Sequence, residues 1–480
     1  MADESVPDNP VVITTCIALE RNVNVTWLKE VVLPRILKHP RFSSVVIEGK
    51  EGKLRFESVP DFVPQNEKLM MHQFDVQHVG GEDKSNRERE KIFQDRLSEL
   101  MTTPLDRERP LWKVTLFPQW SIVDHDESVE KECCMVVVRV HHSISDGIGL
   151  VKYFTSEIID KTSQEEQSRL LVVPERQFKK LRNQVHSSNP EKQQVSPTPA
   201  VTEQRHTTRN MRICVPEPGL LQRGWEFVED VYLSSVRMLF TDPVSVFTRS
   251  TIQREKVCAL MPPSSFTVQM LKNASRVFGV TINDLLYTAV AGASRLYLKE
   301  HGDNPDELKH LRCAIPFNEH ALDSFSLSDV SNVFAIIALN LHVDEEDRMK
   351  RFEVCVRTLR RAKRSNQLVL LMGLIQLVAR MPRFPRKAFW RYLTRATSLL
   401  FTNVPGPREA VHIGGVKVSS LHFFAPADGH AGVVLGMFSY MDKIAMGVAG
   451  DKGRISNPQR FVELLSSEIQ LLLDISKAVN

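Results

Sequence analysis

The segment best suited to chemistry covers residues 136–149 and reads V-V-V-R-V-H-H-S-I-S-D-G-I-G. Its first half has the pattern of a β-strand, and alternation then places four side chains on one face: Val136, Val138, Val140 and His142. His142 therefore ends an apolar strand face, where its ring is partly buried but still reachable. A neutral imidazole with an ordinary pKa of about 6.5 can take the proton of an alcohol as that alcohol attacks a thioester. The pattern thus favours a general base at His142.

Two neighbours of His142 have supporting roles in this interpretation. Asp146 follows it by four residues, in a turn before a helix, and this spacing favours a carboxylate that holds the turn over one that touches the imidazole. His141 points to the other strand face, which favours positioning or hydrogen bonding. The alternative is that two histidines at a strand end are only structural, but the complete H-H-x-x-x-D-G pattern favours catalysis.

The elements that must position this segment alternate between strand and helix patterns. Before residue 160, strands are predicted at 11–18, 44–48, 112–117 and 133–141, and helices at 25–38 and 87–101. After residue 250, helices are predicted at 284–297, 348–364 and from 457 onward, and strands at 333–343, 431–440 and 445–449. This order predicts an α/β protein.

Residues 161–210 separate the two regions and are rich in Gln, Lys, Ser and Pro. Such a segment buries too little apolar surface to order itself, so it predicts a mobile linker. We therefore expect an N-terminal domain at 1–160 that carries the histidine motif, the linker at 161–210, and a C-terminal domain at 211–480.

Composition excludes several classes of function. The 480 residues include 62 basic and 58 acidic side chains, a balance that does not favour nucleic-acid binding. Seven cysteines occur without a C-x-x-C pair, which predicts a reducing compartment and no metal site. The first ten residues lack the pattern of a signal peptide. Neither G-x-S-x-G nor a P-loop occurs, so a hydrolase or an ATP-dependent enzyme has no support.

The H-H-x-x-x-D-G motif resembles that of a superfamily that includes chloramphenicol acetyltransferase and peptide-synthetase condensation domains. Further segments are similar to motifs of its wax ester synthase/diacylglycerol acyltransferase family. These are P-L-D-R-E-R-P-L-W at 104–112, T-I-N-D at 281–284, F-T-N-V-P-G-P at 401–407 and S-Y at 439–440. H-P-R-F-S at 39–43 resembles a motif of the plant members.

The resemblance implies two chloramphenicol acetyltransferase-like domains, each a mixed sheet flanked by helices, with a channel between them. It implies acyl-CoA as the donor, a fatty alcohol or diacylglycerol as the acceptor, and no cofactor. Substrate contacts are expected from five residues of the motifs: Gly147, Asn283, Asp284, Asn403 and Gly406. The alternatives are that Asn283 and Thr281 only cap a helix, and that 403–407 is a structural turn.

Two other functions stay open at this point. One is an acyltransferase that makes another ester or an amide, as condensation domains do, although no carrier-protein or adenylation pattern accompanies the motif. The other is a catalytically silent lipid-binding protein, against which the intact His142, Asp146 and Asn283 argue.

Because the expected acceptors dissolve in membranes, we expect docking on a membrane surface. The apolar stretch at 368–379 is too short to span a bilayer and has basic residues on both sides. These are Arg357, Arg360, Arg361, Lys363 and Arg364 before it, and Arg380, Arg383, Arg386, Lys387 and Arg391 after it. We expect peripheral attachment to the cytosolic face of the endoplasmic reticulum or to a lipid droplet; the plasma membrane and cytoplasm are alternatives. Residues 220–247 are a rival docking segment, and the basic residues could instead bind the phosphates of CoA.

Overall fold

The computed structural model describes residues 11–49, 54–60, 62, 70–79, 85–122, 131–160, 213, 225–226, 228, 232, 241–250, 255–261, 265–318, 334–365, 367–381, 385, 397–426 and 431–479. The predicted linker at 161–210 lies outside these residues, as does most of the rival docking segment at 220–247.

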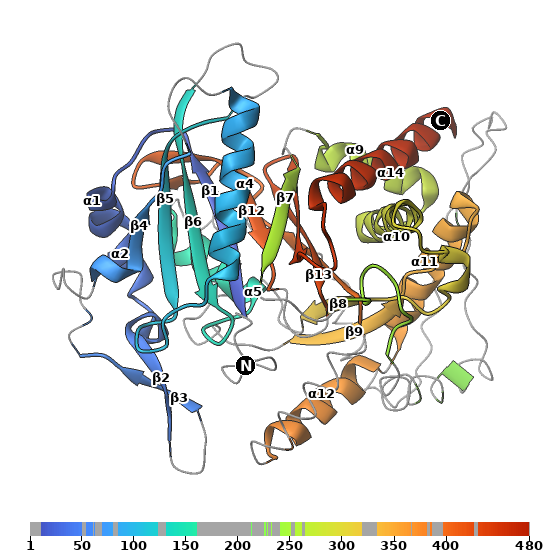
Figure 1. Cartoon of the computed structure of the whole chain (residues 1–480), viewed down its shortest axis with the longest axis horizontal. Coiled ribbons are helices and arrows are strands. Elements are labelled where there is room, and N and C mark those ends of the chain that lie inside the picture. The colour runs from blue at the N-terminus through green and yellow to red at the C-terminus, as the bar shows by residue number, and fades with distance from the viewer. Residues whose placement is uncertain are drawn as a thin grey trace, which may run out of the picture.

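The first sheet has six strands in the order β11-β12-β1-β6-β5-β4 (Figure 1). Their bounds are β1 Val12–Leu19, β4 Phe74–Val76, β5 Trp112–Ile122, β6 Lys131–His141, β11 His412–Ile413 and β12 Val416–Phe424. β4 and β5 run parallel, and the other pairs are antiparallel. The sheet is therefore mixed, as expected.

Strands β11 and β12 belong to the C-terminal part of the chain but complete this N-terminal sheet. β12 pairs with β1, with Thr14 opposite Phe424 and Cys16 opposite His422. The sequence-based division at 161–210 does not anticipate this pairing, because strand patterns do not reveal which distant strand is the partner.

Helices cover both faces of the first sheet. The face of Val136 and Val140 packs against α2 (Leu33–Ile36), α5 (Gly147–Tyr153) and the π-helical turn Leu28–Val32 that follows α1 (Val25–Trp27). The opposite face, with Val137, packs against α4 (Asn86–Thr102), which begins with a capping box between Ser85 and Glu88. A hairpin of β2 (Ser44–Glu48) and β3 (Leu54–Ser58) lies beside this body.

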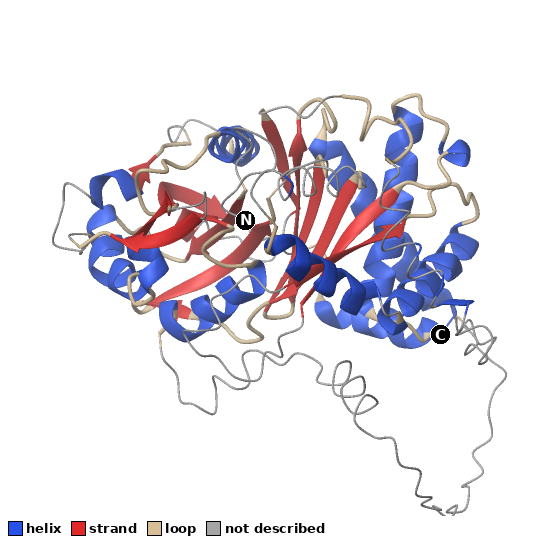
Figure 2. Ribbon diagram, turned by 90° about the horizontal axis from the view of Figure 1, so that it is seen from below, coloured by secondary structure: helices blue, strands red, loops and turns tan. Residues whose placement is uncertain are grey.

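The second sheet also has six strands, in the order β7-β14-β13-β10-β8-β9, and is again mixed. Its strands are β7 Lys256–Met261, β8 Arg312–Asn318, β9 Phe334–Asn340, β10 Leu399–Pro405, β13 Val433–Tyr440 and β14 Lys443–Asp451. A helical layer covers one side of it (Figure 2). The layer consists of α9 Val268–Phe278, α10 Ile282–Glu300, α11 Arg348–Arg364 and α14 Pro458–Val479.

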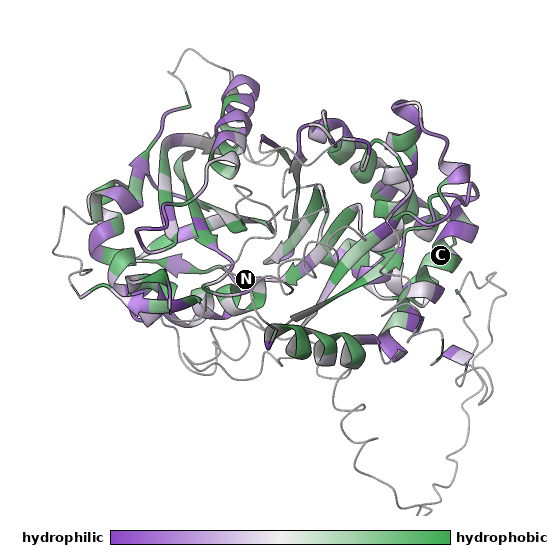
Figure 3. Cartoon of the chain, turned by 60° about the horizontal axis from the view of Figure 1, so that its bottom comes forward, coloured by the Kyte–Doolittle hydropathy of each residue, from purple (hydrophilic) through white to green (hydrophobic). Residues whose placement is uncertain are grey.

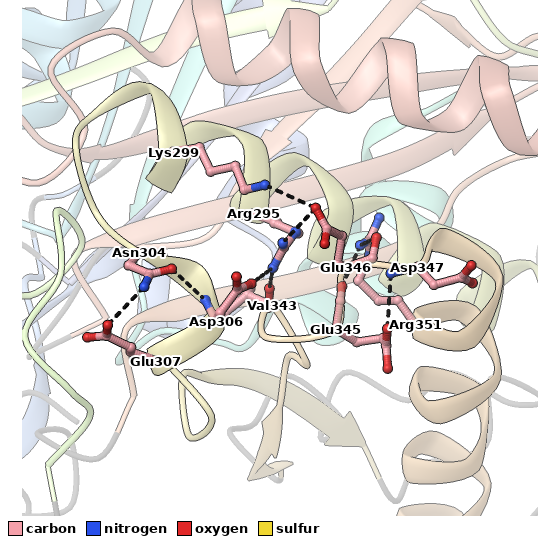
Figure 4. A network of polar contacts seen from close by, with 10 residues as sticks. All are labelled: Arg295, Lys299, Asn304, Asp306, Glu307, Val343, Glu345, Glu346, Asp347 and Arg351. Atoms are coloured by element: carbon pink, nitrogen blue, oxygen red, sulfur yellow. Dashed lines mark hydrogen bonds and ion pairs between the residues drawn. The ribbon is translucent and has the colours of Figure 1, made fainter.

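A buried ionic network joins the helices of this second layer. Arg295 of α10 donates to Asp306 and to the carbonyl oxygen of Val343 (Figure 4). Glu468 of α14 pairs with Arg348 and Arg351 at the start of α11. These contacts fix the helices around the core of the second sheet, so we assign them to stability.

The two sheets meet along β12 and α4. Gly436 of β13 lies so close to β12 that a Cβ there would be 2.3 Å from the carbonyl oxygen of Phe423. On the α4 side, the backbone N–H of Cys258 donates to Ser98 (3.1 Å), and that of Lys256 donates to Thr102 (2.9 Å). The halves are thus held together by close backbone packing and by direct hydrogen bonds.

Helix α12 (Gln367–Ala379) lies at the periphery of the second half, at the lower edge of Figure 1. Among the described residues, no single helix is long and apolar enough to cross a bilayer. Two consecutive helices, α9 and α10, are together long and apolar enough for a span, but they meet at a 93° bend.

Candidate active site

His142 lies directly after the last residue of β6, in the turn that leads from this strand into α5. Its backbone N–H donates to the carbonyl oxygen of Val11 on β1 (2.8 Å), which fixes the start of the turn to the neighbouring strand. The residue is half-buried. His142 therefore follows the strand that carries Val136, Val138 and Val140, and its place on their face stays a prediction.

His141 is buried and is engaged within the turn. Its Nδ1 accepts from the backbone N–H of Ser143 (3.1 Å) and lies 2.8 Å from the Ser143 hydroxyl. A ring nitrogen that accepts an N–H carries no proton, so Nδ1 of His141 is an acceptor in this turn. This geometry supports the positioning role expected for His141.

Asp146 is the N-cap of α5. Its Oδ1 accepts from the backbone N–H of Gly149 (2.7 Å), and its backbone carbonyl accepts from Leu150 (2.9 Å). A Cβ at Gly149 would lie 2.2 Å from the hydroxyl of Ser145, so the capped turn has no room for a larger residue there. Asp146 therefore holds the turn that presents His142, in agreement with the supporting role its spacing suggests.

A cavity of about 130 Å³ lies on the face of the first sheet that carries Val136, Val138 and Val140, between the sheet and its helices. Val136, Val138 and Val140 of β6 form one wall, and Gly147 lies at the edge of the wall next to the turn. The other lining residues include Ile17, Trp27, Leu28, Phe42, Trp112, Leu150, Tyr153, Phe423 and Phe438. The wall carries few polar atoms, so the cavity suits a hydrocarbon chain and not a charged group.

Gly147 keeps the cavity open at its end near the histidine. A Cβ on this residue would approach the Phe423 ring to 3.1 Å. The wall from Val140 to Val136 covers four residues of extended strand, or about 13 Å. The cavity thus begins beside the turn that carries His142 and follows the strand away from it.

Asn283 and Asn403 lie together although 120 residues separate them. Asn403 Nδ2 on β10 donates to Asn283 Oδ1 at the start of α10 (2.5 Å). Asn283 does not cap the helix; Thr281 and Asp284 do so, through a capping box. This contact occupies the oxygen of the Asn283 amide and not its N–H groups, and Asn283 is exposed.

Asp284 and Gly406 have packing roles in the structure. Asp284 is buried, accepts from the Thr281 backbone N–H (2.9 Å) and pairs with Lys363 (3.2 Å). A Cβ at Gly406 would lie 2.3 Å from both the Phe438 ring and the Ser439 carbonyl oxygen. These contacts explain why position 284 carries an aspartate and position 406 a glycine. A contact of either residue with substrate stays a prediction.

The residues that sequence reasoning missed come from distant strands. Phe423 of β12 and Phe438 of β13 line the cavity, and Tyr153 of α5 does so from the helix side. No local signal marks the two phenylalanines, because they look like ordinary core residues of strands. Trp112, part of the P-L-D-R-E-R-P-L-W segment, lines the cavity and donates to the Phe42 carbonyl oxygen (2.8 Å).

Two buried basic side chains lie where β1, β6 and β12 face the second half. Burial lowers the pKa of Arg139 to about 10, and its guanidinium donates to the carbonyl oxygen of Thr103. Burial also lowers the pKa of His422 to about 4, only partly offset by a 3.4 Å contact with the Met261 carbonyl oxygen. His422 is therefore neutral at physiological pH.

The chain matches two models of one protein family. The model of the wax ester synthase/diacylglycerol acyltransferase catalytic domain matches residues 84–286, and that of the C-terminal domain matches residues 330–473. The O-acyltransferase WSD of Acinetobacter baylyi is 26% identical over 402 residues, which cover 78% of this chain and 76% of that protein. A probable diacylglycerol O-acyltransferase of Mycobacterium tuberculosis is 24% identical over 388 residues, covering 79% and 75%.

Solved structures show the same fold. The wax ester synthase/diacylglycerol acyltransferase of Marinobacter aquaeolei VT8 aligns with a TM-score of 0.58 at 16% identity, covering 98% of this chain and 96% of that one. The trichothecene 15-O-acetyltransferase of Fusarium sporotrichioides aligns with a TM-score of 0.54 at 13% identity, covering 97% and 91%. A condensation domain of the calcium-dependent antibiotic synthetase aligns with a TM-score of 0.54 at 12% identity, covering 99% and 92%. With both family models matched in order along most of its length, this chain belongs to the wax ester synthase/diacylglycerol acyltransferase family of acyltransferases.

Proposed function

We propose that this protein transfers a fatty acyl group from acyl-CoA to the hydroxyl of a fatty alcohol or of diacylglycerol, forming a wax ester or triacylglycerol. The observation that carries the proposal is the apolar cavity that begins beside the His142 turn. A hydrocarbon-lined cavity beside the turn that carries the base suits a reaction in which a long acyl chain must bring its thioester to that base.

In the proposed mechanism, both substrates bind before chemistry starts. The imidazole of His142 accepts the hydroxyl proton of the acceptor while its oxygen forms a bond to the thioester carbonyl carbon. The resulting tetrahedral oxyanion collapses, the carbon–sulfur bond breaks, and the imidazolium returns the proton to the departing thiolate. The ester and CoA are released without a covalent enzyme intermediate.

Asn283 is the proposed donor to the oxyanion. Its oxygen accepts from Asn403, which orients its N–H groups away from that contact. A fixed amide donor at such a site is commonly worth about 3 kcal/mol of transition-state stabilisation. The expected channel between the two halves would bring donor and acceptor to His142, and it stays a prediction.

The test is an assay with labelled acyl-CoA, fatty alcohol and diacylglycerol present together, with products separated by lipid class. We expect label in wax ester, in triacylglycerol or in both. Label in an amide from an added amine, with no ester, would favour the condensation-like alternative. Tight acyl-CoA binding without any product would favour a silent lipid-binding protein.

We also propose that the protein docks peripherally on a membrane through α12, at the cytosolic face of the endoplasmic reticulum or on a lipid droplet. α12 is hydrophobic along its length (Figure 3). Leu371 and Val378 are buried, while Leu377 is 55% exposed and Leu370 and Leu374 on the same side are half-buried. An apolar stripe of this kind favours insertion at the headgroup boundary.

The basic residues before α12 contribute less to this docking than their sequence suggests. Arg357 pairs with Glu353, Lys363 with Asp284, and Arg360 donates to the Gly279 carbonyl oxygen. Arg380, at the end of α12, is exposed. The remaining basic residues after it, Arg383, Arg386, Lys387 and Arg391, lie outside the described residues.

A further inference from the structure

We infer that Arg41 is a positioning residue for the reaction, which sets the turn between His142 and Asp146 through the carbonyl oxygen of Ile144. Arg41 belongs to the H-P-R-F-S segment, in which Phe42 lines the cavity but Arg41 does not. The inference rests on His142 as the general base and assigns to Arg41 no contact with substrate.

The contact that carries the inference joins two segments 103 residues apart. Arg41 Nη1 donates to the carbonyl oxygen of Ile144 at 2.7 Å. Ile144 lies midway between His142 and Asp146, and its side chain is fully buried. A hydrogen bond from a charged donor is shorter and stronger than a neutral one, so it restrains the peptide at the centre of the turn.

The two ends of the turn are held by other groups, and Arg41 holds its centre. The backbone of His142 is held by Val11, and Asp146 caps α5 through Gly149. The Ile144 N–H donates to the His141 carbonyl oxygen (3.0 Å). The Ile144 carbonyl oxygen accepts from the guanidinium of Arg41, which fixes the direction in which its peptide points.

Arg41 is itself held in place from several sides. Its backbone N–H donates to Nδ1 of His39 (3.2 Å), within the short 3-10 helix Pro40–Ser43 and its N-cap. Its guanidinium carbon lies 5.3 Å from the centre of the Phe56 ring on β3, in a cation–π contact. The planar guanidinium can stack on the ring and donate at its edge at the same time, which a lysine ammonium cannot do.

The same segment is tied to the far end of α5. The backbone N–H of His39 donates to the Tyr153 hydroxyl (3.2 Å), and that hydroxyl donates to the carbonyl oxygens of Arg35 and Ile36 (both 2.9 Å). The Phe42 ring stacks on Tyr153 with centroids 5.3 Å apart. The 3-10 helix therefore contacts both the turn before α5 and the last residue of α5, so Arg41 relates the turn to the helix that follows it.

Loss of this contact should misplace the base without removing a substrate contact. For Arg41→Ala we expect kcat to fall about 10- to 100-fold, as small displacements of a catalytic group do. The KM for acyl-CoA should change less than about threefold, because no ground-state binding is lost. Arg41→Lys should recover only part of the rate. Low millimolar guanidinium should raise the rate of Arg41→Ala, whereas methylammonium should not.

The experiment measures kcat, KM and the melting temperature for wild type, Arg41→Ala, Arg41→Lys and the matched control Arg55→Ala. Arg55 is on β3, next to the Phe56 that Arg41 contacts, and its side chain is 67% exposed. The control should behave as wild type. A raised KM with unchanged kcat would show that Arg41 binds the CoA phosphates and would overturn the inference, as would a rate loss that only follows the loss of folded protein.

His142→Ala is assayed alongside. If it is active, the proposed function fails; if it is inactive while Arg41→Ala has wild-type kcat, only the present inference fails.

Discussion

The side chain of Asn403 on β10 donates to that of Asn283 at the start of α10, at 2.5 Å, and this contact joins two sequence motifs into one structural unit. Because the contact occupies the Asn283 oxygen, its N–H groups are available to an oxyanion. If the pair acts as one unit, Asn283→Ala should lower kcat/KM about 100-fold, and Asn403→Ala should lower it less. The Asn283→Ala/Asn403→Ala double variant should be no slower than Asn283→Ala alone.

A double-mutant cycle on kcat/KM checks this coupling. Asn273→Ala is the control, since Asn273 is exposed on α9 and contacts Gln269 and Arg276. Strictly additive losses for Asn283 and Asn403 would show that the two amides act separately.

Asp146 is expected to act through the turn and not on the substrate. Asp146→Ala should lower the unfolding free energy by about 1 kcal/mol, because it removes the N-cap of α5, and should also reduce activity. Asp146→Asn keeps an oxygen that can cap and should keep most of the stability. Chemical denaturation and kcat are measured on both variants. An unchanged stability of Asp146→Ala together with a large rate loss would point to a direct catalytic role instead.

The length of the cavity should set the acyl chain that the enzyme prefers. Val138 is at the middle of the β6 wall, so Val138→Phe should fill the cavity and shift preference from long to shorter acyl-CoA. The matched control is Val76→Phe, since Val76 is 41% exposed on β4. The measurement is kcat/KM over a series of acyl-CoA chain lengths. The same profile for Val138→Phe and wild type would show that the chain binds elsewhere.

How far the sequence predicts this structure differs from element to element. The 348–364 helix is confirmed as α11, and the alternation in β6 correctly places three valines on one face, where they line the cavity. Local periodicity is sufficient for both. It could not predict that β12 joins the first sheet, or that Phe423 and Phe438 complete the cavity, because pairing between distant strands depends on the whole fold. Nor could local periodicity predict the contact of Arg41 with Ile144, for the same reason.

Burial of His422 predicts that the interface between the two halves loses stability in acid. Burial lowers its pKa to about 4 in the folded protein, below the ordinary value of about 6.5. The unfolded chain therefore binds a proton between these values that the folded protein does not. The stability that neutral His422 contributes is present above pH about 6.5 and is lost as the pH falls toward 4.

The check is the melting temperature of wild type and His422→Leu between pH 7 and pH 4. The wild type should lose stability more steeply than the variant over this range. If both fall in parallel, His422 is not the group responsible for the acid sensitivity.

Docking through α12 should depend on its exposed apolar stripe. The Leu370→Ser/Leu374→Ser/Leu377→Ser variant should float less with anionic vesicles than wild type, because it removes the side chains expected to enter the headgroup boundary. Leu471→Ser is the control, since Leu471 is 40% exposed on α14. High salt should weaken wild-type binding in part, through exposed Arg380 and the basic residues that follow it. Equal flotation of the triple variant and wild type would exclude α12 as the docking helix.

The account depends most directly on His142 as the base. The decisive measurement is the single-turnover rate of ester formation by His142→Ala, with acyl-CoA binding and the melting temperature measured on the same preparation. We expect a rate about 10²- to 10⁴-fold below wild type, with binding and folding nearly unchanged, and a smaller loss for His141→Ala. A His142→Ala enzyme that keeps more than a few per cent of the wild-type rate would contradict the assignment.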